Sequence, residues 1–315
     1  MESPETSEMV GVILAAGKGS RMSQLPTQLP KPVLPILGRP IIHHQLEMMA
    51  KLGIKKAIVV VGYRGFEIVH MIERLPDTGV SIEYVEQEET LGIAHCLGRL
   101  EGIIDSSFIL FLGDIYFHAP DIHALLEEFA KPGVQGVLGA IHEEDKTIIA
   151  KNFCILCDDD GRATRVIEKP RYPSSNLKGV GVYVFDQVVF DAIRRTPKTA
   201  MRNEYEITES IQIMIDDGRH VRPCACIEAD LNVTDPKDLL AVNLKVLNYQ
   251  NLENFIGDNA VVPTDAILEK AVIGEGAIVG AGATIKNTIV FPGATVPDGM
   301  ALENAVVTEI EILRV

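Results

Sequence analysis

Short apolar runs alternate with segments of mixed polarity through the first 130 residues. Four of the runs are too short to be helices and are typical of strands buried on both faces of a sheet: 10–15, 56–62, 80–85 and 108–113. The segment 41–52 between the first two runs has the apolar spacing of an amphipathic helix. Strands that alternate with helices predict an open, mostly parallel sheet.

The pattern changes beyond residue 134, where strand-like runs follow one another with tighter turns. Asp158-Asp159-Asp160-Gly161 joins two of these runs and has the composition of a hairpin turn. The segments 204–217 and 235–249 are predicted helices. We expect the strand-rich part to be an insertion that carries part of a substrate site.

The last 65 residues carry a regular repeat of apolar pairs. Nine such pairs, with Thr as one member of two of them, begin at positions 261, 267, 272, 278, 284, 289, 295, 301 and 306. The steps are 6, 5, 6, 6, 5, 6, 6 and 5 residues, and small residues fill the gaps. Antiparallel hairpins would not keep so regular a step, so we predict a short left-handed parallel β-helix of about three coils.

Length and repeat together predict three segments. At about 150 residues per domain, 315 residues correspond to two domains. We expect a flexible tail over 1–8, an α/β domain over 9–250 and the β-helix over 251–315.

Charge is distributed unevenly. The chain has 44 acidic and 29 basic side chains, a net charge of −15, which argues against a nucleic-acid partner. From Met9 to Leu46, however, there are four basic residues and no acid, which predicts a local anion site. The N-terminus lacks a basic, apolar leader, no apolar run is long enough to span a membrane, and the five Cys are dispersed. These features predict a cytoplasmic protein without a membrane partner.

A glycine-rich loop follows the first predicted strand. Glycines allow backbone N–H groups to approach phosphate oxygens, and Arg21 adds a charged fork. The loop has neither the third Gly of a dinucleotide fingerprint nor the Gly-Lys-Ser/Thr of a P-loop. We predict that it binds a nucleotide through Leu14, Ala15, Ala16, Gly17, Gly19, Ser20 and Arg21.

Two further features suggest anion chemistry. Pro30 and Pro32 stiffen the backbone around Lys31. Such rigidity is useful if the lysine ammonium must point at a fixed anion, although this segment alone would indicate an ordinary surface lysine. Gly113-Asp114 ends a strongly apolar strand, where packing does not explain an acid.

Taken together, these motifs closely resemble the sugar-nucleotidyltransferase family. The resemblance covers nearly the whole chain, since some members also carry a C-terminal β-helix. It rests on motifs that occur in the family's order: 17–22, Lys31, Gln87 with Gly92, 112–114, 168–170, Arg202 with 204–208, and Asn232. The resemblance implies a Rossmann-like, mostly parallel mixed sheet of the nucleotide-diphospho-sugar transferase type, and makes 9–250 the catalytic domain.

The resemblance also implies an activity. Members transfer a nucleotidyl group from a nucleoside triphosphate to a sugar 1-phosphate and release pyrophosphate, a reaction that needs positioning and charge neutralisation. Arg21 and Lys31 would hold the triphosphate. Asp114 would be a Mg²⁺ ligand with Asn232 as the second, where an Asp is more usual in the family; Asp230 is the alternative.

The remaining family positions concern the sugar and the base. The resemblance assigns the sugar phosphate to Gly113, Glu168, Lys169, Asn176 and Arg202, with Lys169 counted among the catalytic residues. The stretch 147–153 departs from the commoner pattern, so the sugar stays open. Gln87 and Gly92 would read uracil or thymine, and the sequence does not decide between UTP and dTTP.

Two alternatives remain. An acyltransferase built on the β-helix is disfavoured because such enzymes use a His in the coils, and this chain has none after His220. A non-catalytic nucleotide-sugar-binding regulator stays open because Asn232 replaces an acid. We also expect a homo-oligomer, formed through the β-helix.

Overall fold

The computed structural model describes residues 9–17, 29–62, 64–89, 91–200 and 203–315. They fall into two compact units. The first unit contains 45–69 and 73–230 together with the start of the chain, and the second contains the described residues from Leu29 to His44, 70–72 and 231–315. The predicted boundaries of the tail, the catalytic domain and the β-helix stay a proposal.

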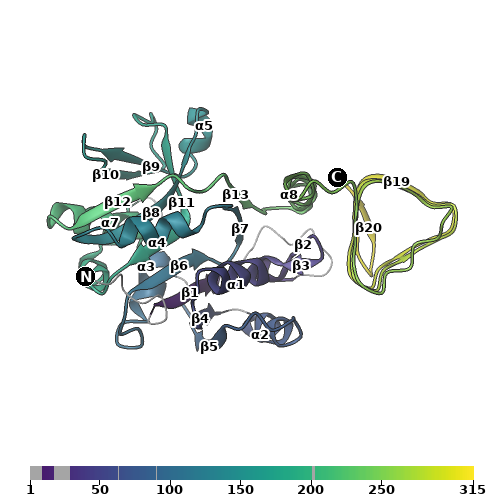
Figure 1. Cartoon of the computed structure of the whole chain (residues 1–315), viewed down its shortest axis with the longest axis horizontal. Coiled ribbons are helices and arrows are strands. Elements are labelled where there is room, and N and C mark those ends of the chain that lie inside the picture. Colours follow the sequence, from purple (N-terminus) through teal and green to yellow (C-terminus); the bar gives the residue numbers. More distant parts are fainter. Residues whose placement is uncertain (1–8, 18–28, 63, 90, 201–202) are drawn as a thin grey trace. The chain divides into compact units, whose positions relative to one another are not determined.

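A mixed sheet forms the core of the first unit (Figure 1). Its main path runs β10-β9-β11-β6-β1-β4-β5, and β8 pairs with β11 and β12. The bounds are β1 Val10–Ala15, β4 Lys56–Val61, β5 Ser81–Glu86, β6 Phe108–Leu112, β8 Val134–His142, β9 Phe153–Cys157, β10 Ala163–Glu168, β11 Leu177–Phe185 and β12 His220–Cys224. The four strands predicted in the first half are confirmed and pair in parallel. β1, β4 and β6 are buried on both faces, as parallel strands usually are, whereas β5 lies at the edge of the sheet and its side chains are exposed or half-buried.

Helices cover this sheet. The group α3 (Ile93–Gly98), α6 (Val189–Arg195) and α7 (Ile207–Asp216) packs together, and α7 lies on β10 and β12. The helix α4 (His123–Phe129) packs on β8, β11 and β12. The remaining elements are β7 (Ile115–His118) and α5 (Lys146–Ile149), together with α1 (Ile41–Lys51), α2 (Gly65–Glu73) and β13 (Ala229–Asn232), which have residues in both units.

The strand-rich region contains the predicted hairpin. β9 and β10 pair antiparallel, and in the turn between them the Gly161 N–H donates to the Asp158 carbonyl (3.0 Å). The helix predicted from residue 204 begins only at Ile207, so its first three residues were predicted wrongly. Glu204 lies in a bend and Glu206 is extended, and the Tyr205 N–H bonds to the Leu91 carbonyl (2.8 Å) instead of starting a helix.

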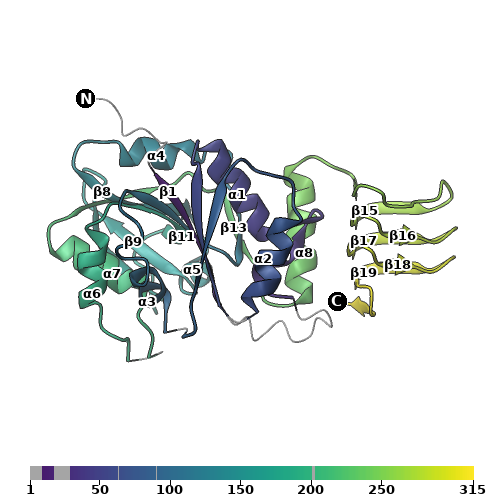
Figure 2. The same cartoon turned by 90° about the horizontal axis from the view of Figure 1, so that it is seen from below.

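Three coils of parallel strands end the second unit. Figure 1 looks along them and shows a three-sided outline, and Figure 2 shows them stacked. The parallel strands are β14 (Phe255–Ile256), β15 (Ile267–Ile273), β16 (Ile278–Val279), β17 (Thr284–Val290), β18 (Thr295–Val296) and β19 (Ala301–Val307), and the last strand, β20 (Ile312–Arg314), pairs antiparallel with β19. Each coil is 17 residues, as in the register Ile267↔Thr284↔Ala301, which is the sum of the predicted steps. The parallel β-helix is therefore confirmed, and its left-handedness stays a prediction.

The helix α8 (Pro236–Tyr249) packs against β15, β17 and β19. The Asp235 side chain caps it by accepting from the Asp238 N–H (2.8 Å), and Pro236 occupies its first turn. The same unit holds the short pair β2 (Pro35–Ile36) and β3 (Arg39–Pro40) and the 3-10 turn η3 (Lys31–Val33). A loop that the sequence places near the start of the chain thus belongs to the unit of the C-terminal coils.

Candidate active site

The predicted nucleotide residues lie where the parallel strands of the first unit end. Leu14 and Ala15 close β1, Ala16 and Gly17 follow, and Gln87 comes directly after β5. Gly62 follows β4 between them, and a Cβ at this glycine would lie 2.9 Å from the Ala16 carbonyl oxygen and 3.1 Å from that of Gln87. A glycine is therefore required for the three strand ends to run side by side. This edge is where open α/β sheets bind ligands.

The turn that carries Asp114 sits against the end of β1. The Gly113 N–H donates to the Leu14 carbonyl (2.9 Å), and a Cβ on Gly113 would lie 2.9 Å from the same oxygen. Asp114 is half-buried at this point. The close approach explains why a glycine precedes the acid, and it brings Asp114 to the edge that Ala16 and Gly17 occupy.

Gln45 holds this turn in place and was not identified from the sequence. The side chain of Gln45 on α1 is fully buried, and its Nε2 donates to the carbonyls of Leu112 and Ile115, at 2.8 Å each. These two carbonyls flank Gly113 and Asp114. The sequence did contain a signal for this role, since Gln45 stands on the apolar face of a predicted helix. A buried amide must find hydrogen-bond partners, so a Gln at such a position indicates a polar contact inside the core.

Gln87 is almost fully buried, with 5% of its surface exposed. Its N–H donates to the Val61 carbonyl (2.8 Å), and its side-chain Nε2 donates to the Glu89 carbonyl (2.6 Å). His95 Nδ1 lies 3.2 Å from the same Nε2. Within the part of the chain that the structure describes, no donor reaches Gln87 Oε1. A buried carbonyl oxygen without a donor is costly, so this atom is suited to a ligand that donates a hydrogen bond.

Gly92 fixes the loop that follows Gln87. Its φ is 115°, and a Cβ would lie 2.4 Å from the Tyr205 carbonyl oxygen. Tyr205 is bound on both sides of Gly92, because its N–H donates to the Leu91 carbonyl and its carbonyl accepts from the Ala94 N–H (3.0 Å). Only glycine combines this φ with such a close approach. The predicted residue Gly92 therefore anchors the loop to the segment that precedes α7.

Glu168 and Lys169 lie together at the end of β10. The Lys169 N–H donates to the Asn152 carbonyl (2.7 Å), and its φ of 43° is unusual for a lysine. The Lys169 ammonium is 3.7 Å from a Glu168 carboxylate oxygen, and the buried Thr208 hydroxyl donates to the other oxygen (3.3 Å). The structure thus presents a paired carboxylate and ammonium, with the lysine side chain 40% exposed.

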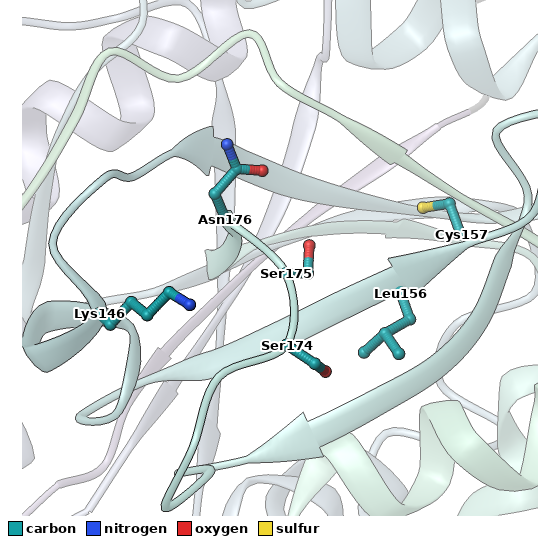
Figure 3. A pocket seen from close by; sticks show the side chains of 6 residues that line it. All are labelled: Lys146, Leu156, Cys157, Ser174, Ser175 and Asn176. Atoms are coloured by element: carbon teal, nitrogen blue, oxygen red, sulfur yellow. The ribbon is translucent and has the colours of Figure 1, made fainter.

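Asn176 lies elsewhere in the first unit. It is exposed just before β11 and lines a cavity of about 560 Å³. Figure 3 shows the six side chains that line the cavity, Lys146, Leu156, Cys157, Ser174, Ser175 and Asn176. They come from α5, β9 and the segment before β11. Asn176 is the one predicted site residue in this lining, so the cavity does not coincide with the edge that carries Gln87 and Asp114.

A buried ion pair was missed at the sequence level. Lys178 Nζ lies 2.5 Å from Asp230 Oδ1, and the two side chains are only 5% and 11% exposed. Burial raises the pKa of Asp230, although the Lys178 ammonium opposes this effect. Asp230 is therefore engaged by a lysine, which makes it a poor substitute for Asn232 as a metal ligand. A lysine within an apolar strand is the signal that predicts such a partner.

Lys31 and Asn232 belong to the second unit. Lys31 opens η3, and the Leu34 N–H donates to its carbonyl (3.0 Å). Asn243 on α8 holds the following residues, because its Oδ1 accepts from the Leu37 N–H (2.8 Å) and its Nδ2 donates to the Pro35 carbonyl (3.0 Å). Asn232 ends β13 with its side chain exposed.

Four predicted residues, Gly19, Ser20, Arg21 and Arg202, lie outside the described residues. Among the residues that are described, no set of three or more His, Cys, Asp or Glu side chains is arranged to hold a metal ion. A separate search of the described helices found none with the length and apolar character needed to cross a membrane.

Comparison with known proteins identifies the family. The family model described as "Nucleotidyl transferase" matches residues 10–248. Agl11, a low-salt glycan biosynthesis nucleotidyltransferase of Haloferax volcanii, is 33% identical over 259 residues, covering 81% of this chain and 71% of that protein. The UTP–glucose-1-phosphate uridylyltransferase AglF of the same organism is 34% identical over 232 residues, covering 73% of this chain and 93% of its own length.

A glucose-1-phosphate thymidylyltransferase of Streptomyces antibioticus is 28% identical over 81% of this chain and 71% of that protein. A crystal structure of UDP-glucose pyrophosphorylase with UDP-glucose aligns at a TM-score of 0.64 and 20% identity, over 76% of this chain and 99% of the other. This alignment confirms the predicted fold class. With the family match over most of the chain and two relatives above 30% identity, the chain belongs to the nucleotidyl transferase family, as its motifs predicted.

Proposed function

We propose that this chain transfers UMP or dTMP from UTP or dTTP to a sugar 1-phosphate, which yields a nucleotide-sugar and pyrophosphate. One observation carries the choice of base. Gln87 Oε1 is a buried acceptor without a donor among the described residues, at the sheet edge where open α/β sheets bind ligands. Uracil and thymine both present an N3–H that such an acceptor binds, and they differ only by a methyl group.

The proposed reaction needs no general base, because the sugar phosphate is already anionic. One of its oxygens forms a bond to the α-phosphorus of the triphosphate as the bond to pyrophosphate breaks in line. Arg21 and Lys31 are proposed to hold the triphosphate and the departing pyrophosphate. Lys169 is proposed to bind the sugar phosphate with Arg202, while Glu168 accepts hydrogen bonds from sugar hydroxyls. The exposed Lys169 ammonium beside Glu168 supports these two roles.

A Mg²⁺ ion is the proposed cofactor. Asp114 supplies a carboxylate and Asn232 an amide oxygen, and Mg²⁺ prefers one or two such protein oxygens together with phosphate oxygens and water. The Asp230–Lys178 pair supports Asn232 as the second ligand. Bound there, the ion would neutralise phosphate charge during transfer.

A screen of nucleoside triphosphates against sugar 1-phosphates, read as pyrophosphate release with and without Mg²⁺, tests the proposal. We expect turnover with UTP or dTTP, dependent on a divalent cation. Asp114→Ala should reduce kcat/KM by more than the roughly 10–100-fold typical of residues that only support a metal ligand. Asp159→Ala, at an exposed turn residue, is the matched control and should leave turnover unchanged.

Two outcomes contradict the proposal. Full activity of Asp114→Ala would remove Asp114 from the metal site. The absence of turnover with every pair, combined with nucleotide-sugar binding by calorimetry, would favour the regulator instead.

We further infer a cytoplasmic homo-oligomer. All five cysteines lie in the described residues as free thiols, which supports a reducing compartment. The β-helix exposes Val261, Ile267 and Ile278, at 56%, 58% and 46%, which supports association through its coils. The particle mass in solution, measured by light scattering, distinguishes a monomer from an oligomer.

A further inference from the structure

A second polar side chain lies beside the proposed base reader Gln87. His95 lies on α3, eight residues after Gln87, and its ring nitrogen Nδ1 is 3.2 Å from Gln87 Nε2. We propose that His95 is a positioning residue that locks the Gln87 amide with its oxygen toward the base, and that it thereby makes the site select uracil or thymine over cytosine. This inference rests on the proposed function.

The hydrogen bonds of Gln87 decide the orientation of its amide. The Glu89 carbonyl can only accept, and it lies 2.6 Å from one end of the amide, so that end is the NH₂ group. The second N–H of the same group is directed at His95 Nδ1, which then accepts, and the His95 proton resides on Nε2. With both N–H groups used, Oε1 is the atom left for a ligand.

His95 is itself held in place on its other side. Its ring stacks on Tyr205, with ring centroids 6.0 Å apart and an angle of 22° between the rings. Tyr205 is fixed by backbone hydrogen bonds to Leu91 and Ala94, and the Lys198 ammonium lies 5.3 Å from the centre of its ring. An imidazole held in this way offers Gln87 an acceptor at a defined point, which a mobile side chain would not.

The consequence concerns one atom of the base. Uracil and thymine carry a hydrogen on N3, which donates to a carbonyl oxygen, whereas cytosine carries a lone pair there. An amide locked with Oε1 as its unused acceptor therefore meets cytosine with two acceptors facing each other. Without the His95 acceptor, only the Glu89 carbonyl holds the NH₂ group, so the amide is less firmly fixed in the orientation that disfavours cytosine.

Two variants separate this role from simple packing. His95→Phe keeps an aromatic ring on Tyr205 but removes the acceptor, and His95→Asn removes the ring but keeps an acceptor near the Nδ1 position. The measurement is kcat/KM for the preferred one of UTP and dTTP and for the matching cytosine nucleotide. We expect His95→Phe to lower the preference for uracil or thymine about tenfold, the effect of one neutral hydrogen bond. His95→Asn should keep the preference within about twofold of wild type.

The outcomes separate the role of His95 from the proposed function. A wild-type enzyme without turnover on UTP and dTTP contradicts the proposed function itself. If the wild-type enzyme is active, an unchanged base preference in His95→Phe overturns the role of His95. A loss of base preference in His95→Asn alone also overturns it, because the effect would then come from ring stacking. His95→Leu replaces the Phe variant if that protein does not fold. The change should appear mainly in KM, since the base lies away from the reacting phosphate.

Discussion

Single polar side chains inside the first unit determine much of its site geometry. Gln45 fixes the turn around Asp114, and Lys178 and Asp230 form an ion pair that is almost fully removed from water. Buried ion pairs gain little net stability, because desolvation offsets the attraction, but removing one partner leaves an uncompensated charge. The pair joins β11 to the start of β13, so its loss would disturb the strand that leads to Asn232.

Replacing Lys178 alone should therefore be more harmful than replacing both partners. We expect Lys178→Met to lower the free energy of unfolding by about 3–5 kcal/mol, and the double variant Lys178→Met/Asp230→Leu to recover most of that loss. Urea denaturation measures all the variants, with exposed Lys151→Met as the control. Equal losses in the single and the double variant would show that packing, not the orphaned carboxylate, sets the cost.

Residues of the site differed in how well the sequence revealed them. Gln87 and Gly92 were identified through the resemblance to the family, and Gly113-Asp114 also because it ends an apolar strand. In the structure Gln87 directly follows β5, Gly113 and Asp114 follow β6, and Gly92 precedes α3, while their roles stay a prediction. Gln45 and His95 were not identified, because each gains its role from a partner distant in sequence or in a loop. Nothing in local spacing specifies that Gln45 meets the carbonyls of Leu112 and Ile115.

At the scale of elements, the attachment of α4 to β12 combines charge and packing. Glu128 near the end of α4 bonds to Arg222 on β12 and to Lys131. Burial pushes the pKa of Glu128 upward, but the hydrogen bonds and charges of Lys131 and Arg222 outweigh burial and hold that pKa below its ordinary value. A carboxyl with a depressed pKa in the folded protein stabilises it above its ordinary pKa and loses this contribution as the pH falls through the folded value.

Glu128→Gln should thus be less stable than wild type at neutral pH, by about 1 kcal/mol, the upper range for a partly exposed ion pair. The difference should shrink as the pH falls below the ordinary pKa of Glu. Thermal unfolding from pH 7 to pH 3 gives both curves, and exposed Glu127→Gln serves as the control. A difference that stays constant across this range would assign the effect to the hydrogen bonds alone.

Elements were easiest to predict where the hydrophobic pattern is strictly periodic. The spacing of the nine apolar pairs contains the 17-residue coil, because every third pair occupies the same position in successive coils. The order of the central sheet was not predicted, because β11 is paired with β6 and β8 by contacts far apart in sequence. Likewise, the helix predicted from residue 204 was shortened by the bond from Tyr205 to Leu91.

At the scale of the molecule, the chain does not divide as its sequence order suggests. The described loop from Leu29 to His44 belongs to the same unit as α8 and the β-helix. Asn243 joins them, because it bonds to the backbone of Leu37 and Pro35 from within α8 and is itself fully buried. The loop carries Lys31, so a residue proposed to act on phosphate depends on a helix more than 200 positions away in sequence.

Asn243→Leu tests this dependence. The change leaves the Leu37 N–H and the Pro35 carbonyl buried without partners, and we expect a loss of about 2–4 kcal/mol in the free energy of unfolding. Because the loop holds Lys31, the KM for the triphosphate should also rise. Urea titration and steady-state kinetics measure the two effects against exposed Asn248→Leu. A destabilised protein with unchanged KM would show that the loop does not position Lys31.

The contact between Gly38 and Phe255 has a consequence for recombination between relatives. A Cβ on Gly38 would lie 2.9 Å from the Phe255 ring, and the φ of Gly38 is +74°. Exchanging only the coils between two family members would therefore place a foreign side chain against this glycine. A working chimera must inherit the early loop and the late coils from the same parent, so the two ends of the gene are expected to diverge together.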